Sequence, residues 1–224
     1  MDWTAIWLSA RLSLATMLTL VVVGVPIAYW VAFSRWRWEF LVEAIVALPL
    51  VLPPTVLGFY ILVAISPVSP VGRAYAAITG RGLPFSFEGL LVASVLYSLP
   101  FAVQPFSVAF AAVDRRLIES SWTLGVSRAQ TFARVVLPLS LRGVLTGMVL
   151  SFAHTLGEFG VVLMVGGNLP GRTRTVSIAI YDAVQSLDYA AAWRTSLLLL
   201  AVSFIILAIT YSMQRTVWAI WPTS

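Results

Sequence analysis

Long apolar stretches without a charged residue alternate with short polar connections along this chain. A helix needs about 20 mostly apolar residues to cross a bilayer, and the stretches have that length. The pattern therefore predicts an all-α protein with five membrane-spanning helices, near residues 8–33, 42–65, 87–113, 139–165 and 193–213. No internal repeat or low-complexity linker divides the chain, so we expect one membrane domain over residues 1–224.

Two of the predicted spans contain residues that disturb a membrane helix. Pro49, Pro53 and Pro54 lie in the second span, where each removes a backbone donor and kinks the helix. The freed carbonyl groups then need protein or cavity water as partners. From the residues alone, the prolines fit either a helix bent around a translocation pathway or a packing kink.

Glu158 interrupts the fourth predicted span. A charged group at membrane depth usually faces the helix bundle or a water-filled cavity. Because a carboxylate repels anions, a structural or gate-forming role fits Glu158 better than contact with an anionic substrate. His154 lies four residues earlier, so the two side chains could pair on one helix face; the alternative is a buried, hydrogen-bonded histidine.

Composition supports a membrane protein and excludes several chemistries. Apolar residues make up 60% of the chain and charged residues 10%, against about 45–50% and about 25% in soluble domains. All 14 basic residues are Arg, there is no Cys, and His154 is the single His. A lysine-containing phosphate loop, a thiolate zinc site and a multi-histidine metal site are therefore excluded. We expect no catalytic residues, no metal and no cofactor bound by this chain.

The longest polar connection, residues 114–138, has the pattern of two short helices. Ile118 and Trp122 share a face of the first helix, Gly125 supplies a stop, and Ser127 can cap the second helix. Pro138 marks the entry to the next span. From the residues alone, this connection is either an amphipathic loop on the membrane surface or a projection that contacts a partner.

Within this connection, Glu119-Ser120-Ser121, Gly125, Val135 and Leu137-Pro138 resemble the E-A-A-x3-G-x9-I-x-L-P signature of permease subunits of ATP-binding-cassette (ABC) importers. The spacing matches throughout, with Ser for both Ala and Val for Ile. The resemblance implies an ABC importer permease core with coupling helices that sit in a cleft of a cytoplasmic ATPase subunit. That partner, and not this chain, would bind ATP and Mg²⁺. The residues expected to couple to it are Glu119, Ser120, Ser121, Trp122, Gly125, Phe132, Leu137 and Pro138; Trp122 and Phe132 are added by their chemistry and not by the motif.

Four further stretches, at residues 48–59, 156–160, 167–173 and 177–182, resemble the permease subunits of molybdate importers, some of which also carry tungstate. The resemblance implies ATP-driven import by alternating access. It also implies a homodimer, two ABC ATPase subunits and an extracytoplasmic molybdate-binding protein. A permease for sulfate or another tetrahedral oxyanion is the alternative, and it predicts a heterodimer with a sister permease.

Six residues are candidates for the pathway or its gate: Pro53, Pro54, Glu158, Asn168, Arg172 and Arg174. The forked donors of Arg match a tetrahedral oxyanion, so Arg172 and Arg174 could receive the anion. They could also dock an acidic surface of the binding protein or form a solvated flank.

The distribution of Arg predicts the orientation of the chain. The densest block, within residues 115–142, is expected in the cytoplasm by the positive-inside rule. This places the N-terminus outside and the C-terminus in the cytoplasm, and the scattered Arg residues predict no nucleic acid partner. The resemblance to ABC importer permeases implies that the membrane is a prokaryotic inner membrane, with lipid around the chain. Two other function classes are weaker: an intramembrane hydrolase on His154 and Ser151 lacks a nucleophile pattern, and a channel or passive scaffold leaves the 119–138 signature without a partner.

Overall fold

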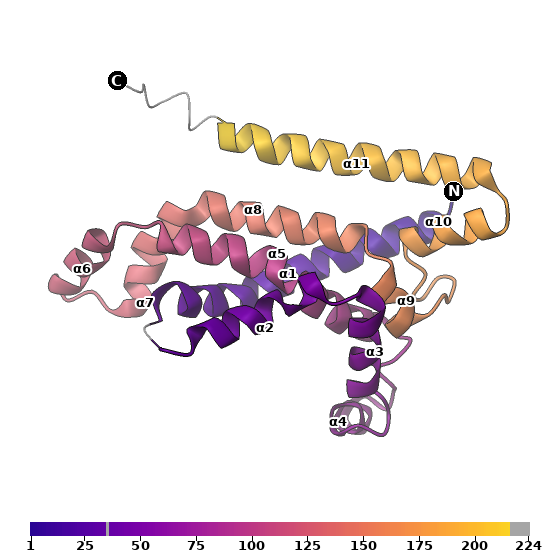
Figure 1. Ribbon diagram of the computed structural model, residues 1–224, viewed down its shortest axis with the longest axis horizontal. Coiled ribbons are helices and arrows are strands. Elements are labelled where there is room, and N and C mark those ends of the chain that lie inside the picture. Colours follow the sequence, from indigo (N-terminus) through magenta and orange to yellow (C-terminus); the bar gives the residue numbers. More distant parts are fainter. Residues whose placement is uncertain (35, 216–224) are drawn as a thin grey trace.

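The computed structural model describes residues 1–34 and 36–215, and the described residues form helices and no strands. The helices, in chain order, are α1 (Trp3–Phe33), α2 (Glu39–Val51), α3 (Pro54–Ala64), α4 (Pro70–Thr79), α5 (Phe87–Ala111), α6 (Arg115–Thr123), α7 (Arg128–Thr131), a π-helical turn (Phe132–Val136), α8 (Leu137–Leu156), α9 (Gly160–Gly166), α10 (Val176–Gln185) and α11 (Tyr189–Arg215). The molecule is elongated, with α6 and α7 at one end of its long axis and the N-terminus, α9 and α10 toward the other (Figure 1).

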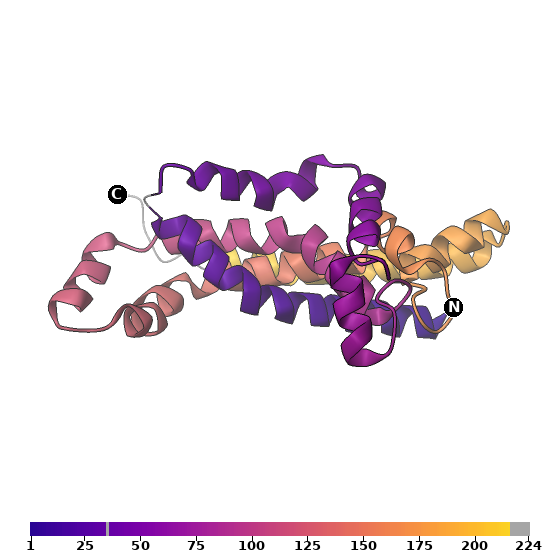
Figure 2. The ribbon, with the colours of Figure 1, turned by 90° about the horizontal axis from the view of Figure 1, so that it is seen from below.

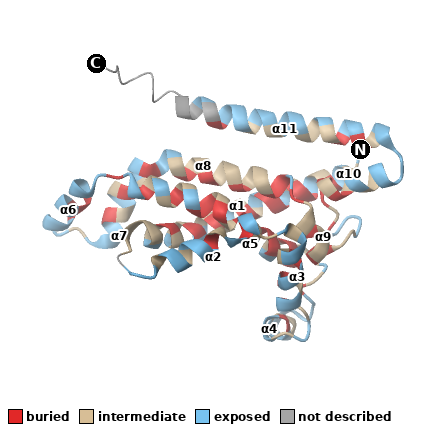
Figure 3. Ribbon diagram, viewed as in Figure 1, coloured by how far each residue is buried: buried red, intermediate tan, exposed pale blue. Residues whose placement is uncertain are grey.

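Helices α1, α5 and α8 pack together as the central bundle of the molecule. Their buried residues form an almost continuous band along the long axis (Figure 3). Small residues bring the helices close together: a Cβ on Gly147 of α8 would lie 2.6 Å from the ring of Phe106 on α5. Such small-residue contacts are how membrane helices gain packing energy where lipid is as apolar as the side chains.

Four spans are present as helices long and apolar enough to cross a membrane: α1, α5, the continuous helical segment Arg128–Leu156, and α11 from Tyr189 to Thr210. The fourth predicted span therefore ends at Leu156, before Glu158, and not near residue 165. The chain continues into the separate short helix α9.

The second predicted span is not one helix, because α2 and α3 meet at a bend of 115°. The break falls at Leu52 and Pro53, whose ψ angles of 137° and 134° are extended. A residue that precedes proline is disfavoured in the helical region, and both Leu52 and Pro53 precede one. Pro49 is accommodated inside α2. Figure 2 shows α2 along the long axis and α3 turned across it.

Helix α11 differs from the bundle in how little of it is covered. Only 11% of its most apolar 18-residue window is buried, against 50% for α5. It packs on α10 and, more weakly, on α8, and most of its side chains are exposed (Figure 3). Most of the surface of α11 is therefore left for lipid or another subunit to cover.

Candidate coupling surface and membrane break

The connection between α5 and α8 forms the projection predicted from its sequence. The carboxylate of Asp114 accepts the Arg116 N–H at 2.9 Å and caps α6. Gly125 ends that turn with φ +79°, donating its N–H to the Trp122 carbonyl at 2.9 Å. Ser127 then starts α7 with a reciprocal capping box to Gln130. The helix stop at Gly125 and the cap at Ser127 are both confirmed.

Ser121, which stands where the signature has Ala, holds the two helices of the projection together. Its hydroxyl lies 2.8 Å from the hydroxyl of Thr131 and donates to the Ile118 carbonyl at 2.8 Å. Both Ser121 and Thr131 are buried. Ser120 instead donates back to the Arg116 carbonyl at 2.7 Å and is exposed. The departures from the signature are therefore compatible with its shape, because each hydroxyl has a partner within the projection.

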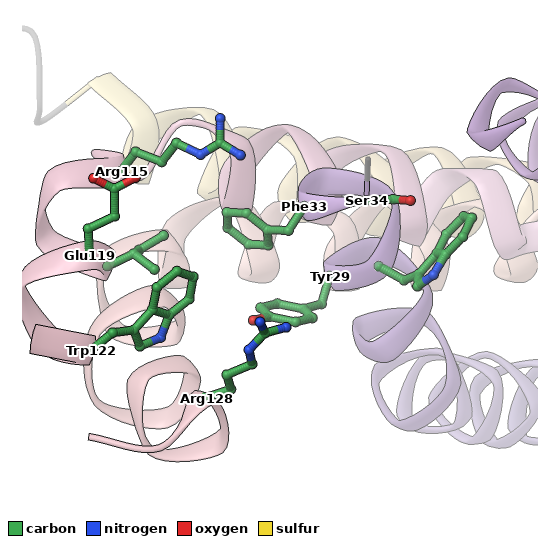
Figure 4. A pocket seen from close by; sticks show the side chains of 9 residues that line it. Tyr29, Phe33, Ser34, Arg115, Glu119, Trp122 and Arg128 are labelled. Atoms are coloured by element: carbon green, nitrogen blue, oxygen red, sulfur yellow. The ribbon is translucent and has the colours of Figure 1, made fainter. Parts of the chain in front are cut away.

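Trp122 and Leu124 form an apolar patch at the tip of the projection. Trp122 is 43% exposed and Leu124 is 83% exposed, whereas Ile118 on the same helix is buried against the bundle at 4%. Below Trp122 lies a pocket of about 510 Å³ between α6 and the end of α1. Trp122, Arg128 and Tyr29 point toward one another there (Figure 4), with the Arg128 guanidinium 5.5 Å from the Trp122 ring centroid.

Phe132 does not share this exposed patch. Its ring packs edge-to-face on Tyr29 of α1 at 5.1 Å and on Phe110 of α5 at 5.6 Å. Phe132 thus faces the bundle of its own chain, which opposes its expected contact with a partner. It joins the projection to α1 and α5.

Leu137 and Pro138 lie where the projection runs into α8. The helix is continuous there through a π-helical turn, in which the Leu137 N–H bonds to the Phe132 carbonyl. Pro138 has no N–H to offer the carbonyl of Arg134 four residues earlier, which is consistent with the wider π turn. Leu137 packs against the core and Pro138 is exposed.

Glu158 lies in the break between α8 and α9, not inside a helix. It is 5% exposed, and its Oε2 accepts the Ser94 hydroxyl of α5 at 3.2 Å. The side chain thereby ties the break to α5. Its Oε1 has no hydrogen-bond partner among the residues described.

Of the two interpretations of His154, pairing with Glu158 is not the one that the structure shows. His154 Nδ1 lies 2.9 Å from the Ser98 hydroxyl, and its ring stacks on Phe101 at 3.9 Å. Helix α8 ends between the two residues, so the i, i+4 spacing no longer places them on one face. The interpretation as a hydrogen-bonded histidine is the one that the structure supports, with the side chain half-buried.

One of the candidate gate residues, Pro54, adjoins this break. A Cβ on Gly160 would lie 2.7 Å from Pro54 Cβ, and a Cβ on Gly58 would lie 2.7 Å from Met164 Cβ. Helices α3 and α9 are therefore in close contact, because at each of these glycines the backbone of one helix lies against a side chain of the other. The bend at Pro53–Pro54 and the break at Glu158 form one structural unit, although they lie about a hundred residues apart in the sequence.

The loop after α9 is tied down by a polar cluster that we call the Arg174 cluster: Asp2, Asn168, Arg174 and Asp182. Arg174 Nε donates to Asn168 Oδ1 at 2.7 Å, and its guanidinium lies 3.3 Å from Asp182 Oδ2 and 4.0 Å from Asp2 Oδ2. Asn168 Nδ2 also donates to Asp182 Oδ2 at 2.7 Å. With two carboxylates beside it, Arg174 is poorly suited to receive an anion, one of the three roles that the sequence leaves open for it.

Arg172 belongs to the same loop but is exposed and has no ion pair within the described part of the chain. It lines a second pocket with Arg11 and Arg81, two residues that the sequence did not single out; the one available signal was a lone Arg early in an apolar helix. No group of three His, Cys, Asp or Glu side chains among the described residues is arranged to hold a metal ion.

Comparison with known proteins is consistent with this geometry. The model of the family "binding-protein-dependent transport system inner membrane component" matches residues 24–218. The chain is 49% identical to the molybdenum transport system permease protein ModB of Azotobacter vinelandii, over 96% of this chain and 95% of that protein. It is 32% identical to the sulfate transport system permease protein CysT of Synechocystis, over 91% of this chain and 71% of that protein.

Among solved structures, the inward-facing MetNI methionine ABC transporter has a chain with the same fold. The TM-score is 0.73 at 17% identity, covering 96% of this chain and 95% of that one. At this identity the likeness concerns the fold alone.

Proposed function

Because the chain belongs to the binding-protein-dependent transport system inner membrane components, we propose that it is the transmembrane subunit of an ATP-driven importer whose cargo is molybdate. The observation that supports molybdate as the cargo is the 49% identity to a molybdenum permease along nearly the whole of both chains. Tungstate, a tetrahedral oxyanion of the same charge, is a second expected cargo. This chain catalyses nothing, and ATP and Mg²⁺ bind to a partner ATPase subunit.

The projection of α6 and α7 is the docking element for that ATPase. An exposed Trp beside an exposed Leu is costly in water and is typical of a protein contact. The rigid turn at Gly125 and the Ser121–Thr131 contact hold the patch in one shape. Glu119, Ser120 and Trp122 form the exposed contact surface, while Phe132, Leu137 and Pro138 transmit its movement to the bundle.

Alternating access requires the bundle to move when the projection is moved. Phe132 links the projection to α1 and α5, and α8 continues from it without a break as far as Leu156. This continuous helix is first interrupted at the break that contains Glu158, which lies against α3 and α5. We therefore place the gate at this break, with Pro53, Pro54 and Glu158 as its structural residues.

The chain crosses the inner membrane with its N-terminus outside and its C-terminus in the cytoplasm. Two observations support this orientation. The start of α1 lies at the end opposite to α6, whereas α11 runs back toward the α6 end (Figure 1). The projection itself carries Arg115, Arg116 and Arg128, in accordance with the positive-inside rule. Because the chain has no Cys, maleimide labelling of Ala129→Cys and Ser186→Cys from each side tests it cleanly.

Two copies of this permease, two ATPase subunits and an extracytoplasmic binding protein form the complete importer. The alternative, a sulfate permease, has one observation in its favour, which is the 32% identity to a sulfate permease protein. That alternative predicts two different permease chains in one assembly. A single permease species in the purified complex would exclude it.

Reconstitution tests the proposal. The permease, its ATPase and its binding protein are placed in proteoliposomes, and uptake of labelled molybdate is measured with ATP or a non-hydrolysable analogue inside. We expect uptake with ATP alone, reduced by excess tungstate and much less by excess sulfate. ATP-dependent uptake of sulfate with no uptake of molybdate would contradict the assignment of molybdate as the cargo. Uptake of molybdate without the ATPase would contradict an ATP-driven mechanism.

A further inference from the structure

Three arginines from separate segments line one pocket at the end of the molecule opposite to α6. Arg11 comes from α1, Arg81 from the α4–α5 connection and Arg172 from the loop after α9. The pocket has a volume of about 560 Å³. We call it the three-arginine pocket.

Local structure places each of these arginines. The Arg11 guanidinium lies 4.4 Å from the ring centroid of Phe87, at the start of α5. Arg81 follows Gly80, whose φ of +69° ends α4, and Arg172 follows Gly171, whose φ is +74°. Each side chain therefore projects from a helix or from a defined turn.

The backbone around the pocket is also fixed. The Phe85 N–H donates to the Val165 carbonyl at 3.0 Å, and Phe85 is held at φ +58°. Thr173 donates to the Gly166 carbonyl at 2.7 Å, next to Arg172. The two loops that carry Arg81 and Arg172 are thus anchored to α9.

The charge inside the pocket is unbalanced. Its lining has three guanidinium groups and a single carboxylate, Glu88, and in the described part of the chain none of the three arginines has an ion pair. Arg174, two residues from Arg172, lies instead beside Asp182 and Asp2. The loop after α9 therefore carries two different arginines: Arg174, whose charge is neutralised by carboxylates, and Arg172, which has no ion pair in the described part of the chain and lines the pocket.

We propose that the three-arginine pocket binds a tetrahedral oxyanion. Planar guanidinium groups donate paired hydrogen bonds to such oxygens, and a cleft lined by one sign of charge raises the local concentration of the opposite ion. The proposal deepens the proposed function, on which it rests for the identity of the anion, by assigning the first site that the cargo meets on the permease. The same chemistry suits the phosphate of a lipid headgroup, so the test separates the two sources.

The test uses the permease alone, in a phosphate-free maltoside detergent, and measures binding of labelled molybdate by equilibrium dialysis. Arg172→Gln and Arg11→Gln should each weaken binding about tenfold, the value expected for loss of a charged hydrogen bond. Arg172→Lys keeps the charge but loses the fork and should bind with intermediate affinity. Arg73→Gln, an exposed arginine on α4 outside the pocket lining, is the matched control and should bind like the wild type.

A titration with short-chain phosphatidylglycerol identifies the source of the anion. Displacement of molybdate by the lipid in the wild type means that headgroup phosphate shares the site; no displacement means that free oxyanion alone uses it. Either result supports the proposal if the arginine variants lose binding.

Three results would overturn the proposal. The first is that the wild type binds no molybdate, sulfate or phosphate, and the second is that all variants bind molybdate as well as the wild type does. The third is that the arginine variants keep oxyanion binding and lose only the docking of the binding protein. The last result would assign the pocket to acidic side chains of that protein. Failure of the pocket is distinguishable from failure of the proposed function, because the reconstituted wild-type importer reports cargo uptake independently. If the wild-type importer takes up molybdate and the arginine variants bind it unchanged, the proposed pocket is rejected and the proposed function is retained.

Discussion

The two ends of the elongated molecule are built differently. At the α6 end, a single projection presents exposed Trp122 and Leu124, and its hydrogen bonds are largely internal to the projection. At the N-terminal end, the loop after α9 is bound to other parts of the chain. Asn168 and Arg174 reach Asp182 of α10 and Asp2 before α1, and the Val176 N–H donates to Ser9 of α1 at 2.8 Å.

This difference suits the role that we propose for each end. A projection with an exposed apolar patch at its tip, attached through the helix that continues as α8, can transmit a push from a protein partner. A set of loops fixed by polar contacts over long sequence distances can hold arginines in place for an anion. The α1–α5–α8 bundle connects the two ends. The following changes test the proposed division of roles, in order of expected effect.

Enlarging Gly147 should damage both ends together. A Cβ at this position would meet Phe106 at 2.6 Å and the Ala102 carbonyl oxygen at 3.0 Å, so Gly147→Leu forces α5 and α8 apart. We expect loss of monodisperse protein in size-exclusion chromatography, with loss of both ATPase retention and oxyanion binding. Ala201→Leu, at an exposed position on α11, is the control and should behave like the wild type. Normal behaviour of Gly147→Leu would contradict the packed bundle.

Two glycines with the same backbone geometry allow the ends to be separated. Gly125 and Gly171 have φ +79° and +74°, and at either one a Cβ would meet nothing within 4 Å. Valine at such a position costs about 1–2 kcal/mol and distorts the turn. Gly125→Val should reduce ATP-dependent uptake about tenfold and weaken co-purification of the ATPase, whereas Gly171→Val should leave that co-purification unchanged. Equal loss of ATPase in both variants would remove the distinction between the ends.

Glu158 tests whether the break is held by hydrogen bonds or by charge. Glu158→Ala removes the acceptor for the buried Ser94 hydroxyl and should cost about 1–2 kcal/mol because that donor loses its partner, with uptake reduced several-fold. Glu158→Gln keeps an acceptor and should be close to the wild type in melting temperature and uptake. If Gln is as defective as Ala, the carboxylate itself is required and the hydrogen bond to Ser94 is insufficient.

Trp122 and Trp38 are both exposed, at 43% and 45%, but only Trp122 lies on the projection. Trp122→Ala should weaken ATPase binding about fivefold to tenfold, as expected for an aromatic interface residue. Trp38→Ala should leave the affinity unchanged. The measurement is titration of the ATPase onto the detergent-solubilised permease, and the reverse order of effects would move the docking surface to the α1–α2 connection.

The smallest effect is expected at the Arg174 cluster. Asn168→Ala removes bonds to Arg174 and Asp182, which are partly exposed and therefore worth about 1 kcal/mol in total. The melting temperature should fall by about 2–4 °C, with ATPase retention unchanged. A loss of ATPase retention would show that a change at the N-terminal end affects ATPase binding at the α6 end.

Features that depend on near neighbours in the sequence could be predicted. The α1, α5 and α11 spans follow from apolar length, and the turn at Gly125 and the cap at Ser127 follow from local backbone chemistry. The departures at Ser120 and Ser121 are tolerated because each hydroxyl finds a carbonyl within one helical turn.

Features that depend on distant partners could not be predicted. The Ser94–Glu158 bond joins residues 64 apart and the Val176–Ser9 bond joins residues 167 apart, so no sequence spacing suggested them. Arg174 was indistinguishable from Arg172 until Asp2 and Asp182 were located beside it. The prolines predicted a bend, but its angle of 115° depends on the packing of α3 against α9 through Gly58 and Gly160.

Site-specific cross-linking in the assembled importer tests the central claim, that the α6 end meets the ATPase and the opposite end does not. A photo-reactive residue is placed at Leu124, which is 83% exposed on the projection, and in a second variant at Ser186, exposed beyond α10. We predict that Leu124 captures the ATPase and Ser186 does not, in a complex that still takes up molybdate. Capture of the ATPase from Ser186, or none from Leu124 in an active complex, would contradict the account.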